Sequence, residues 1–260
     1  MKIFAIGDPH LSFDERIEKP MDVFGAGWKD HSGRLKEKWE AVVSPEDIVL
    51  ILGDISWGLR LDEAMADLTW IHELPGKKVI TKGNHDLWWV STNKLNTLFD
   101  DVTFLQNHCY MVGAGNGGSG QEKSLSDRGS KGLDGGMEGG GLAICGTRGW
   151  ICPGTQGFDD HDNKIYEREQ LRLRMSLDDA REHGAGEIIC CLHYPPTNDK
   201  FQSSGFTQLM TEYKVKQCLY GHLHGKEAFK NGFQGQWNGT RYRLVSLDYV
   251  GCEPQLVKEI

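Results

Sequence analysis

The chain has 260 residues, a net charge of −8 at neutral pH and 38% hydrophobic residues, which suits one large globular unit or at most two. The acidic balance argues against broad binding to nucleic acids, because that binding needs clustered lysines and arginines. No apolar run approaches the roughly 18 residues that a membrane-spanning helix needs. Most of the seven cysteines lie in apolar runs and none forms a Cys-x-x-Cys pair. We therefore expect a cytoplasmic protein with no signal peptide and no membrane partner.

Short apolar runs recur along the chain and predict β-strands. Several are apolar throughout, which indicates strands that are buried on both faces. The predicted strands are residues 2–7, 47–52, 77–82, 102–105, 109–113, 142–146, 187–193, 216–220 and 241–247.

Helical patterns separate the early strands. They cover residues 32–43, 62–74 and 91–99, and a longer amphipathic stretch covers 161–183. Strands that alternate with helices and then follow each other more closely predict α/β layers with a partly antiparallel second half.

One segment differs from the rest in composition. Residues 113–141 contain 12 glycines in 29 positions, and glycine at that density loses too much entropy on ordering to form an element of its own. We expect a single domain over 1–260 in which 113–141 is a surface insertion, and a lid over a substrate is the alternative interpretation.

Polar side chains follow five of the predicted strands. Because the carboxyl ends of strands in α/β sheets gather ligands, we expect these groups to meet at one edge. They are Asp8 and His10, then Asp54, then Asn84, His85 and Asp86, then His193, and finally His222 and His224.

The types and spacing of these residues favour metal binding. In the pairs "DPH" and "HLH" the side chains are two residues apart, so both point to the same side of an extended segment. Carboxylate and amide oxygens mixed with imidazole nitrogens suit Mn²⁺, Fe, Zn²⁺, Ni²⁺ or Co²⁺ and make a poor calcium site. If seven of these nine side chains are ligands, they are too many for one tetrahedral ion. They fit two ions that share a carboxylate.

The ordered motifs "GDPH", "GDISWG", "GNHD", "HYPP" and "GHLH", which span residues 7 to 224, resemble the calcineurin-like metallophosphoesterase family. The resemblance implies a four-layer αββα sandwich, with two mixed β-sheets flanked by helices and a dinuclear metal site at the strand ends. It also implies two ligand sets. Asp8, His10 and His224 would bind the first ion, Asn84, His193 and His222 the second, and Asp54 both.

The same resemblance gives catalytic roles to two further residues. His85 would face the substrate phosphate, and Asp86 would orient the imidazole ring of His85. The reaction would be attack of a metal-bridging hydroxide on phosphorus, with His85 stabilising the developing charge or protonating the leaving oxygen.

Substrate contacts are expected from loops near the strand ends. The connection 12–31 contains Trp28 and His31, which could touch substrate, although the sequence favours a packed loop. Arg148, in "GTRGW", could bind a phosphate bidentately or form a surface ion pair.

Together these features predict a metal-dependent phosphohydrolase that acts on a small phosphoester substrate. We expect two divalent ions, with manganese first among the candidates, and a preference for phosphodiesters. A phosphomonoesterase, a protein phosphatase or a nucleotide pyrophosphatase is the alternative within the class. An inactive scaffold is disfavoured because no ligand is missing, and a DNA nuclease because the net charge is −8.

Overall fold

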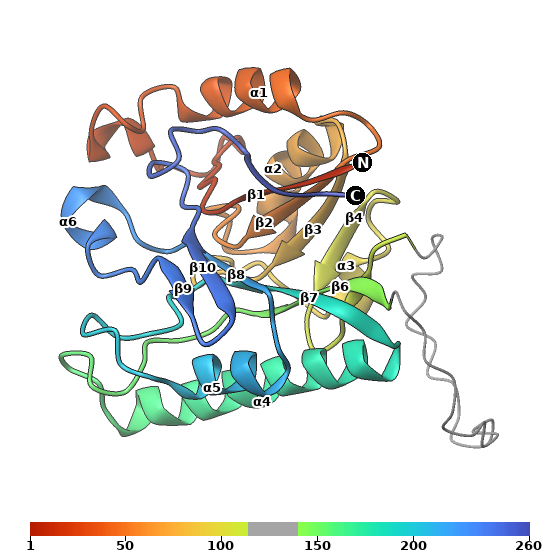
Figure 1. Ribbon diagram of the computed structural model, residues 1–260. Coiled ribbons are helices and arrows are strands. Elements are labelled where there is room, and N and C mark those ends of the chain that lie inside the picture. Colours follow the sequence, from red (N-terminus) through yellow and green to blue (C-terminus); the bar gives the residue numbers. More distant parts are fainter. Residues whose placement is uncertain (114–139) are drawn as a thin grey trace.

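The computed structural model describes residues 1–113 and 140–260. Two β-sheets pack against each other, and helices cover the outer face of each sheet (Figure 1). The expected insertion at 113–141 lies almost entirely outside the described residues, so neither interpretation of it is tested.

The first sheet has the strand order β11-β1-β2-β3-β4. Strands β1, β2, β3 and β4 are parallel to one another, and β11 pairs antiparallel with β1. β2 has the sequence IVLIL and is buried at every position, because one face packs on helices and the other on the second sheet. The strands are β1 (Lys2–Ile6), β2 (Ile48–Leu52), β3 (Lys77–Thr81), β4 (Val102–Leu105) and β11 (Gln255–Glu259).

The second sheet has the order β5-β6-β7-β8-β10-β9. β6, β7, β8 and β10 are parallel, whereas the edge strands β5 and β9 are antiparallel to their neighbours. Its strands are β5 (Tyr110–Met111), β6 (Gly141–Thr147), β7 (Ala185–Leu192), β8 (Gln217–Tyr220), β9 (Gly235–Trp237) and β10 (Thr240–Leu244).

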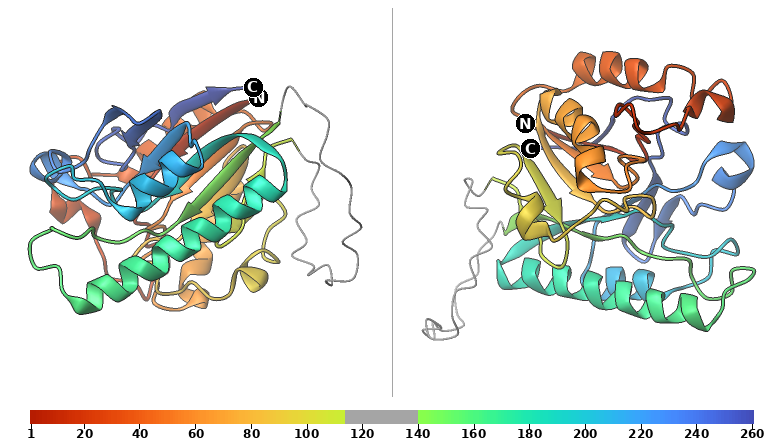
Figure 2. Two further views of the ribbon diagram at one scale, coloured as in Figure 1. Left: turned by 60° about the horizontal axis from the view of Figure 1, so that its bottom comes forward. Right: turned by 180° about the vertical axis from the view of Figure 1, so that it is seen from behind.

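The helices lie on opposite sides of this sandwich. α1 and α2 cover the first sheet, and the long α4 runs along the outer face of the second sheet beside α5 (Figure 2). The helices are η1 (Met21–Phe24, a 3-10 turn), α1 (His31–Val42), α2 (Leu61–Glu73), α3 (Thr92–Leu95), α4 (Asp160–Glu182), α5 (Gly205–Glu212) and α6 (Gly225–Phe229).

Three apolar clusters fill the spaces between the layers. One includes Trp39 of α1 and Ile51 of β2 and lies under the first helical layer. The second includes Leu173 of α4 and lies under the other helical layer. The third, with Leu50 of β2 and Ile189 of β7, lies between the sheets. The four-layer αββα class expected from the resemblance is therefore confirmed.

All nine predicted strands are present, and the sequence analysis missed five elements. η1, α5, α6, β9 and β11 are short, so their patterns are too brief for periodicity to reveal. The predicted helix at 91–99 is shorter than expected, since α3 covers only Thr92–Leu95. Antiparallel pairs occur at edges of both sheets, not only in the second half of the chain.

The two sheets meet where the strands end in the site region. Gly7, just after β1, forms a parallel bridge to Ser246, which follows β10. The termini lie side by side on β1 and β11 (Figure 1). Among the described residues, no helix combines the length and apolar character needed to cross a bilayer.

Candidate metal centre

The loops that follow β1 and β2 run side by side and bring the first polar residues together. The backbone N–H of Asp8 donates to the carbonyl of Gly53 (3.0 Å), and that of His10 donates to Asp54 (2.9 Å). Asp8, His10, Asp54 and His222 all have left-handed backbones, with φ of 59°, 48°, 52° and 72°. This conformation is uncommon for residues with a Cβ and costs free energy, so it persists where the surroundings impose it, typically at functional sites.

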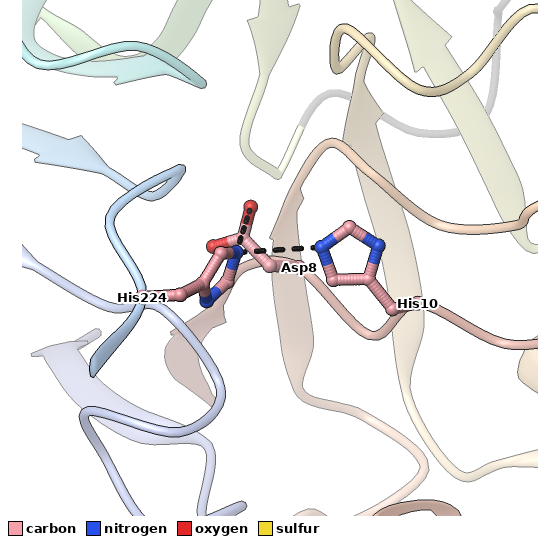
Figure 3. A group of neighbouring side chains, drawn as sticks. All are labelled: Asp8, His10 and His224. Atoms are coloured by element: carbon pink, nitrogen blue, oxygen red, sulfur yellow. Dashed lines mark hydrogen bonds and ion pairs between the residues drawn. The ribbon is translucent and has the colours of Figure 1, made fainter. Parts of the chain in front are cut away.

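Asp8, His10 and His224 form the first group of candidate ligands (Figure 3). One donor atom from each lies within 4.8 Å of the other two. The Nε2 atoms of His10 and His224 are 3.3 Å apart, and Nε2 of His224 is 4.0 Å from Oδ1 of Asp8. Asp8 is completely buried and His10 is 3% exposed. These residues come from the first and last motifs, which are over 200 positions apart.

Asp54, His193 and His222 form the second group. Nδ1 of His222 lies 3.2 Å from Nε2 of His193, and the side-chain oxygen of Asn84 lies 2.7 Å from the same Nε2. Oδ2 of Asp54 is 3.4 Å from His193 Nε2 and 3.8 Å from His10 Nε2. One carboxylate oxygen therefore lies between the two groups.

Two of the histidines are held by partners outside the groups. His193 donates its Nδ1 proton to the carbonyl of Leu52 (2.9 Å), and His224 donates its Nδ1 proton to Oδ1 of Asp248 (2.9 Å). In both rings Nδ1 is thus occupied by a partner outside the group, and Nε2 is the nitrogen that faces the group, as in metal-binding histidines. The sequence analysis missed Asp248. It directly follows the predicted strand 241–247, so the pattern of a polar residue after a strand could have found it.

The structure gives Asp86 a different task from the one expected. Its buried carboxylate accepts five hydrogen bonds. The donors are the backbone N–H groups of Asp54 (2.9 Å), Ile55 (2.8 Å), Ser56 (3.4 Å) and Gly83 (2.7 Å) and the indole N–H of Trp88 (3.1 Å). None of its hydrogen bonds within the described residues reaches His85. The expectation that Asp86 orients His85 is therefore wrong, and Asp86 instead ties the loop after β2 to the loop after β3.

His85 lies beside the centre without entering either group. Its backbone N–H donates to Oδ1 of Asp54 (2.7 Å). Its half-buried ring lies 4.4 Å from the Trp57 ring and 5.7 Å from the His10 ring, measured between centroids. Burial lowers the pKa of His85, and nearby His193 and His224 add to this while Asp54 opposes it. The ring is therefore neutral near pH 7 and carries one N–H.

The electrostatics of the centre call for an added cation. No Lys or Arg of the described residues forms an ion pair with Asp8 or Asp54, although both are buried. Burial, followed by the positive charge of His193, lowers the pKa of His222 to about 3. Burial opposes protonation of His193, but Asp54 and Asp8 outweigh it and raise the pKa of His193 to about 9.

The spacing of the ring nitrogens fits an ion. Two nitrogens bound tetrahedrally to one cation, each at 2.0–2.1 Å, lie roughly 3.3 Å apart. The pairs His10–His224 and His193–His222 are 3.3 Å and 3.2 Å apart. Two buried carboxylates also need positive charge close by. The residues present therefore fit a pair of divalent ions.

The residues expected to touch substrate differ in their positions. The Trp28 ring lies 5.2 Å from His224 and 5.6 Å from His10, so it forms a wall of the first group. His31 is largely buried and contacts Trp28, with ring centroids 5.5 Å apart. The carbonyl of Arg148 accepts the N–H groups of both His193 and Tyr194 (3.0 Å each), which places Arg148 beside the second group.

Comparison with known proteins agrees with this geometry. The model of the calcineurin-like phosphoesterase family matches residues 1–226. The chain belongs to this family, whose members are metal-dependent phosphohydrolases.

Individual relatives are more distant. Gene 66 proteins of Mycobacterium phages L5 and D29 are 43% and 46% identical over 58 and 57 residues, which is 22% of this chain and 28% of each phage protein. Phosphopantetheinyl hydrolase from Mycobacterium tuberculosis has a similar structure, with a TM-score of 0.55 and 15% identity over 100% of this chain and 96% of that one. A protein of unknown function from Aquifex aeolicus, AQ665, gives a TM-score of 0.48 at 12% identity over 98% and 95% of the two chains. At these identities, the likeness to phosphopantetheinyl hydrolase shows the fold.

Proposed function

We propose that this protein hydrolyses phosphoesters, with phosphodiesters favoured, at a centre of two divalent ions. Asp8, His10 and His224 would hold one ion, and His193, His222 and Asn84 the other. The observation that carries the proposal is the position of Asp54, because one of its oxygens lies within 4 Å of a histidine from each group. A carboxylate between two histidine groups is the arrangement that two neighbouring ions require.

The donor set limits the choice of ion. Carboxylate and amide oxygens with imidazole nitrogens, and no thiolate, suit Mn²⁺, Fe, Zn²⁺, Ni²⁺ or Co²⁺, and we propose Mn²⁺ first. Two bound ions would supply Lewis acidity toward phosphoryl oxygens and lower the pKa of a water molecule. Asn84 has no charge, so Asp8 and Asp54 only partly neutralise two dications. The centre therefore keeps positive charge that attracts a phosphate.

The protein side chains have separate tasks around the phosphate. His85 is neutral near pH 7 and can donate its N–H to an oxygen of the substrate, which stabilises negative charge that develops on the leaving group. Asp54 fixes the backbone of His85 through the hydrogen bond to its N–H. Trp57 packs against the ring of His85 and excludes water from one side of it.

Aromatic rings border the centre on both sides. Trp28 contacts the first group, and Tyr194 packs on His222 of the second group, with ring centroids 4.0 Å apart. Such walls favour substrates with an apolar or planar group next to the phosphate. His31 supports Trp28 from behind and is proposed as a packing residue.

The test is hydrolysis of a matched pair of chromogenic substrates, bis(p-nitrophenyl) phosphate and p-nitrophenyl phosphate. Metal-stripped protein is assayed after separate addition of Mn²⁺, Ni²⁺, Co²⁺, Zn²⁺ and Mg²⁺. We expect Mn²⁺ to restore turnover and the diester to be cleaved faster. Faster cleavage of the monoester would overturn the diester preference and favour a phosphatase. No turnover with any metal would overturn the proposed activity.

Two matched variants test whether the loss of turnover is specific to a carboxylate of the centre. Asp54→Asn removes the shared carboxylate and should abolish turnover, whereas Asp100→Asn makes the same change at an exposed residue and should not. Asp100 belongs to a distant surface group with His72 and Asp101. Equal activity of the two variants would contradict the role of Asp54.

A further inference from the structure

A cluster of positive side chains lies next to the second ligand group. It consists of Arg148, Arg168 and Arg172, each of which forms an ion pair with the carboxylate of Glu169, and of Lys82, which follows β3, and we name it the Arg148 cluster. Three guanidinium groups around one buried carboxylate are unusual in a chain whose net charge is −8. The proposed phosphoesterase activity assigns a task to none of these cations.

The cluster forms where the two sheets touch. Lys82 directly follows β3 of the first sheet, and Arg148 directly follows β6 of the second. A Cβ at Gly146 of β6 would lie only 3.0 Å from the methyl group of Thr81 in β3. The ends of these strands are therefore in contact, and their next residues converge.

Glu169 does not need all of this charge. Its fully buried carboxylate accepts a hydrogen bond from the hydroxyl of Thr147 (2.6 Å) and one from Nη1 of Arg172 (2.8 Å). Nη2 of Arg148 is farther from it, at 3.5 Å. Nε of Arg148 is buried and has no hydrogen-bond partner among the described residues. Arg148 is therefore held near Glu169 but is not fully bound by it.

The guanidinium groups also lie close together. Nη2 of Arg148, Nε of Arg168 and Nη1 of Arg172 lie 3.5, 3.7 and 2.8 Å from the same oxygen, Oε1 of Glu169. Three guanidinium groups at one carboxylate carry more positive charge than that carboxylate neutralises. An added anion would offset this excess.

A series of neighbouring aromatic rings connects the second ligand group to Arg148. Tyr194 lies 4.0 Å from His222, Trp150 lies 5.0 Å from Tyr194, and the Arg148 guanidinium lies 4.5 Å from the Trp150 ring. The side chain of Arg148 is 16% exposed. A molecule bound at the second group can thus extend along this wall to the cluster.

We infer that the Arg148 cluster is a subsite for a second phosphate group of the substrate, bound by Arg148 and Lys82 while the first phosphate occupies the centre. The inference rests on the proposed function and specifies its substrate class as phosphoesters that carry a further phosphate. That phosphate is either the adjacent one of a diphosphate or a separate one on the same molecule. Guanidinium and ammonium groups provide the hydrogen bonds and charge that phosphate recognition uses.

The experiment compares AMP, ADP and adenosine 3′,5′-bisphosphate as competitors in the hydrolysis of bis(p-nitrophenyl) phosphate by the Mn²⁺-loaded protein at fixed free Mn²⁺. The competition constant measures binding whether or not the nucleotide is itself cleaved. We expect at least one of the two-phosphate nucleotides to bind about tenfold or more tightly than AMP. Tighter binding of ADP would indicate an adjacent second phosphate, and tighter binding of the bisphosphate a separate one.

Substitutions then test which residues cause the preference for nucleotides with two phosphates. Arg148→Gln and Lys82→Gln should each remove most of the preference for two phosphates, and Arg148→Lys should keep part of it. Lys77→Gln, at the exposed opposite end of β3, and Arg181→Gln, exposed on α4, are matched controls that should retain it. If AMP binds as tightly as the two-phosphate nucleotides, or if both cluster variants keep the preference, the inference is overturned. A variant that loses affinity equally for all three nucleotides indicates a structural role for that residue and also counts against it.

Failure of the proposed activity can be told apart from failure of this inference. If the protein hydrolyses no phosphoester, equilibrium dialysis of the same nucleotides against the Mn²⁺-loaded protein measures the preference directly. A preference that disappears in Lys82→Gln would then support the anion subsite even though the activity was wrong. Hydrolysis without any preference would support the activity and overturn the subsite.

Discussion

The Asp8→Asn substitution should show how the negative charge of Asp8 affects stability and metal binding, because it removes the charge and keeps the size of the side chain. Asp8 is completely buried, and both of its oxygens accept the backbone N–H of His222 (3.1 and 3.0 Å). Burial raises the pKa of Asp8, although His224 and His193 oppose this. The carboxylate is therefore costly in the absence of a cation. Asparagine keeps the size and one acceptor oxygen, so the metal-stripped variant should unfold at the same temperature as the wild type or higher.

Addition of metal should make the wild type more stable than the Asp8→Asn variant. An ion present at about 100 times its Kd stabilises the folded state by about 2.7 kcal/mol. For a chain of 260 residues, two such ions should raise Tm by about 10 °C and one by about 5 °C. The wild type should show the larger shift. Asp8→Asn weakens the first group and should show about half of it.

The assay is thermal unfolding, followed by calorimetry or tryptophan fluorescence, of metal-stripped protein with increasing Mn²⁺. Asp100→Asn is the control, since it removes an exposed carboxylate from a surface group that also contains a histidine. It should keep the full wild-type shift. The reasoning is refuted if Asp8→Asn keeps the full shift, or if the wild type shows no shift with any of the candidate metals.

Four further substitutions test separate parts of the centre. His85→Ala should keep both ions and lower turnover by about two to four orders of magnitude; metal analysis with kinetics would check this, and full activity would exclude the role of His85. Asn84→Ala should reduce the bound metal toward one ion per chain, so an unchanged ratio in elemental analysis would contradict the second ligand set. Asp248→Asn should weaken metal binding by about 10- to 100-fold because His224 loses its anionic partner, and metal titration would reveal unchanged affinity if this is wrong. Asp86→Ala leaves five donors without their acceptor and should lower the free energy of unfolding by about 3–5 kcal/mol; urea unfolding would show a change below 1 kcal/mol if these bonds contribute little.

Much of the fold could be predicted from the sequence because the core strands are apolar at nearly every position. β2 and β7 lie between two apolar layers, so their burial appears directly in their composition. The edge strands β9 and β11 have partly exposed faces and polar residues. Their pairing depends on neighbours that are distant in the chain, which a local pattern does not contain.

The candidate ligands could be found for a similar reason. Each follows a strand that the composition reveals, and parallel strands deliver their carboxyl ends to the same edge. The role of Asp86 could not be found in this way. The family resemblance implied that the side chain of Asp86 orients the ring of His85. The Asp86 side chain, however, turns inward to the backbone of the loop after β2, a partner that is distant in the sequence.

The Arg148 cluster shows where prediction from local patterns ends. Arg148 was singled out because arginine after a strand can bind phosphate, but Lys82 was not, since a lysine at a strand end usually faces water. Their partnership depends on how the two sheets are packed, because Lys82 belongs to one sheet and Arg148 to the other. The ligand groups also join the two sheets, yet there each residue type already indicates metal chemistry. Lysine and arginine carry no such indication, so only the packing of β3 against β6 reveals an excess of positive charge beside the centre.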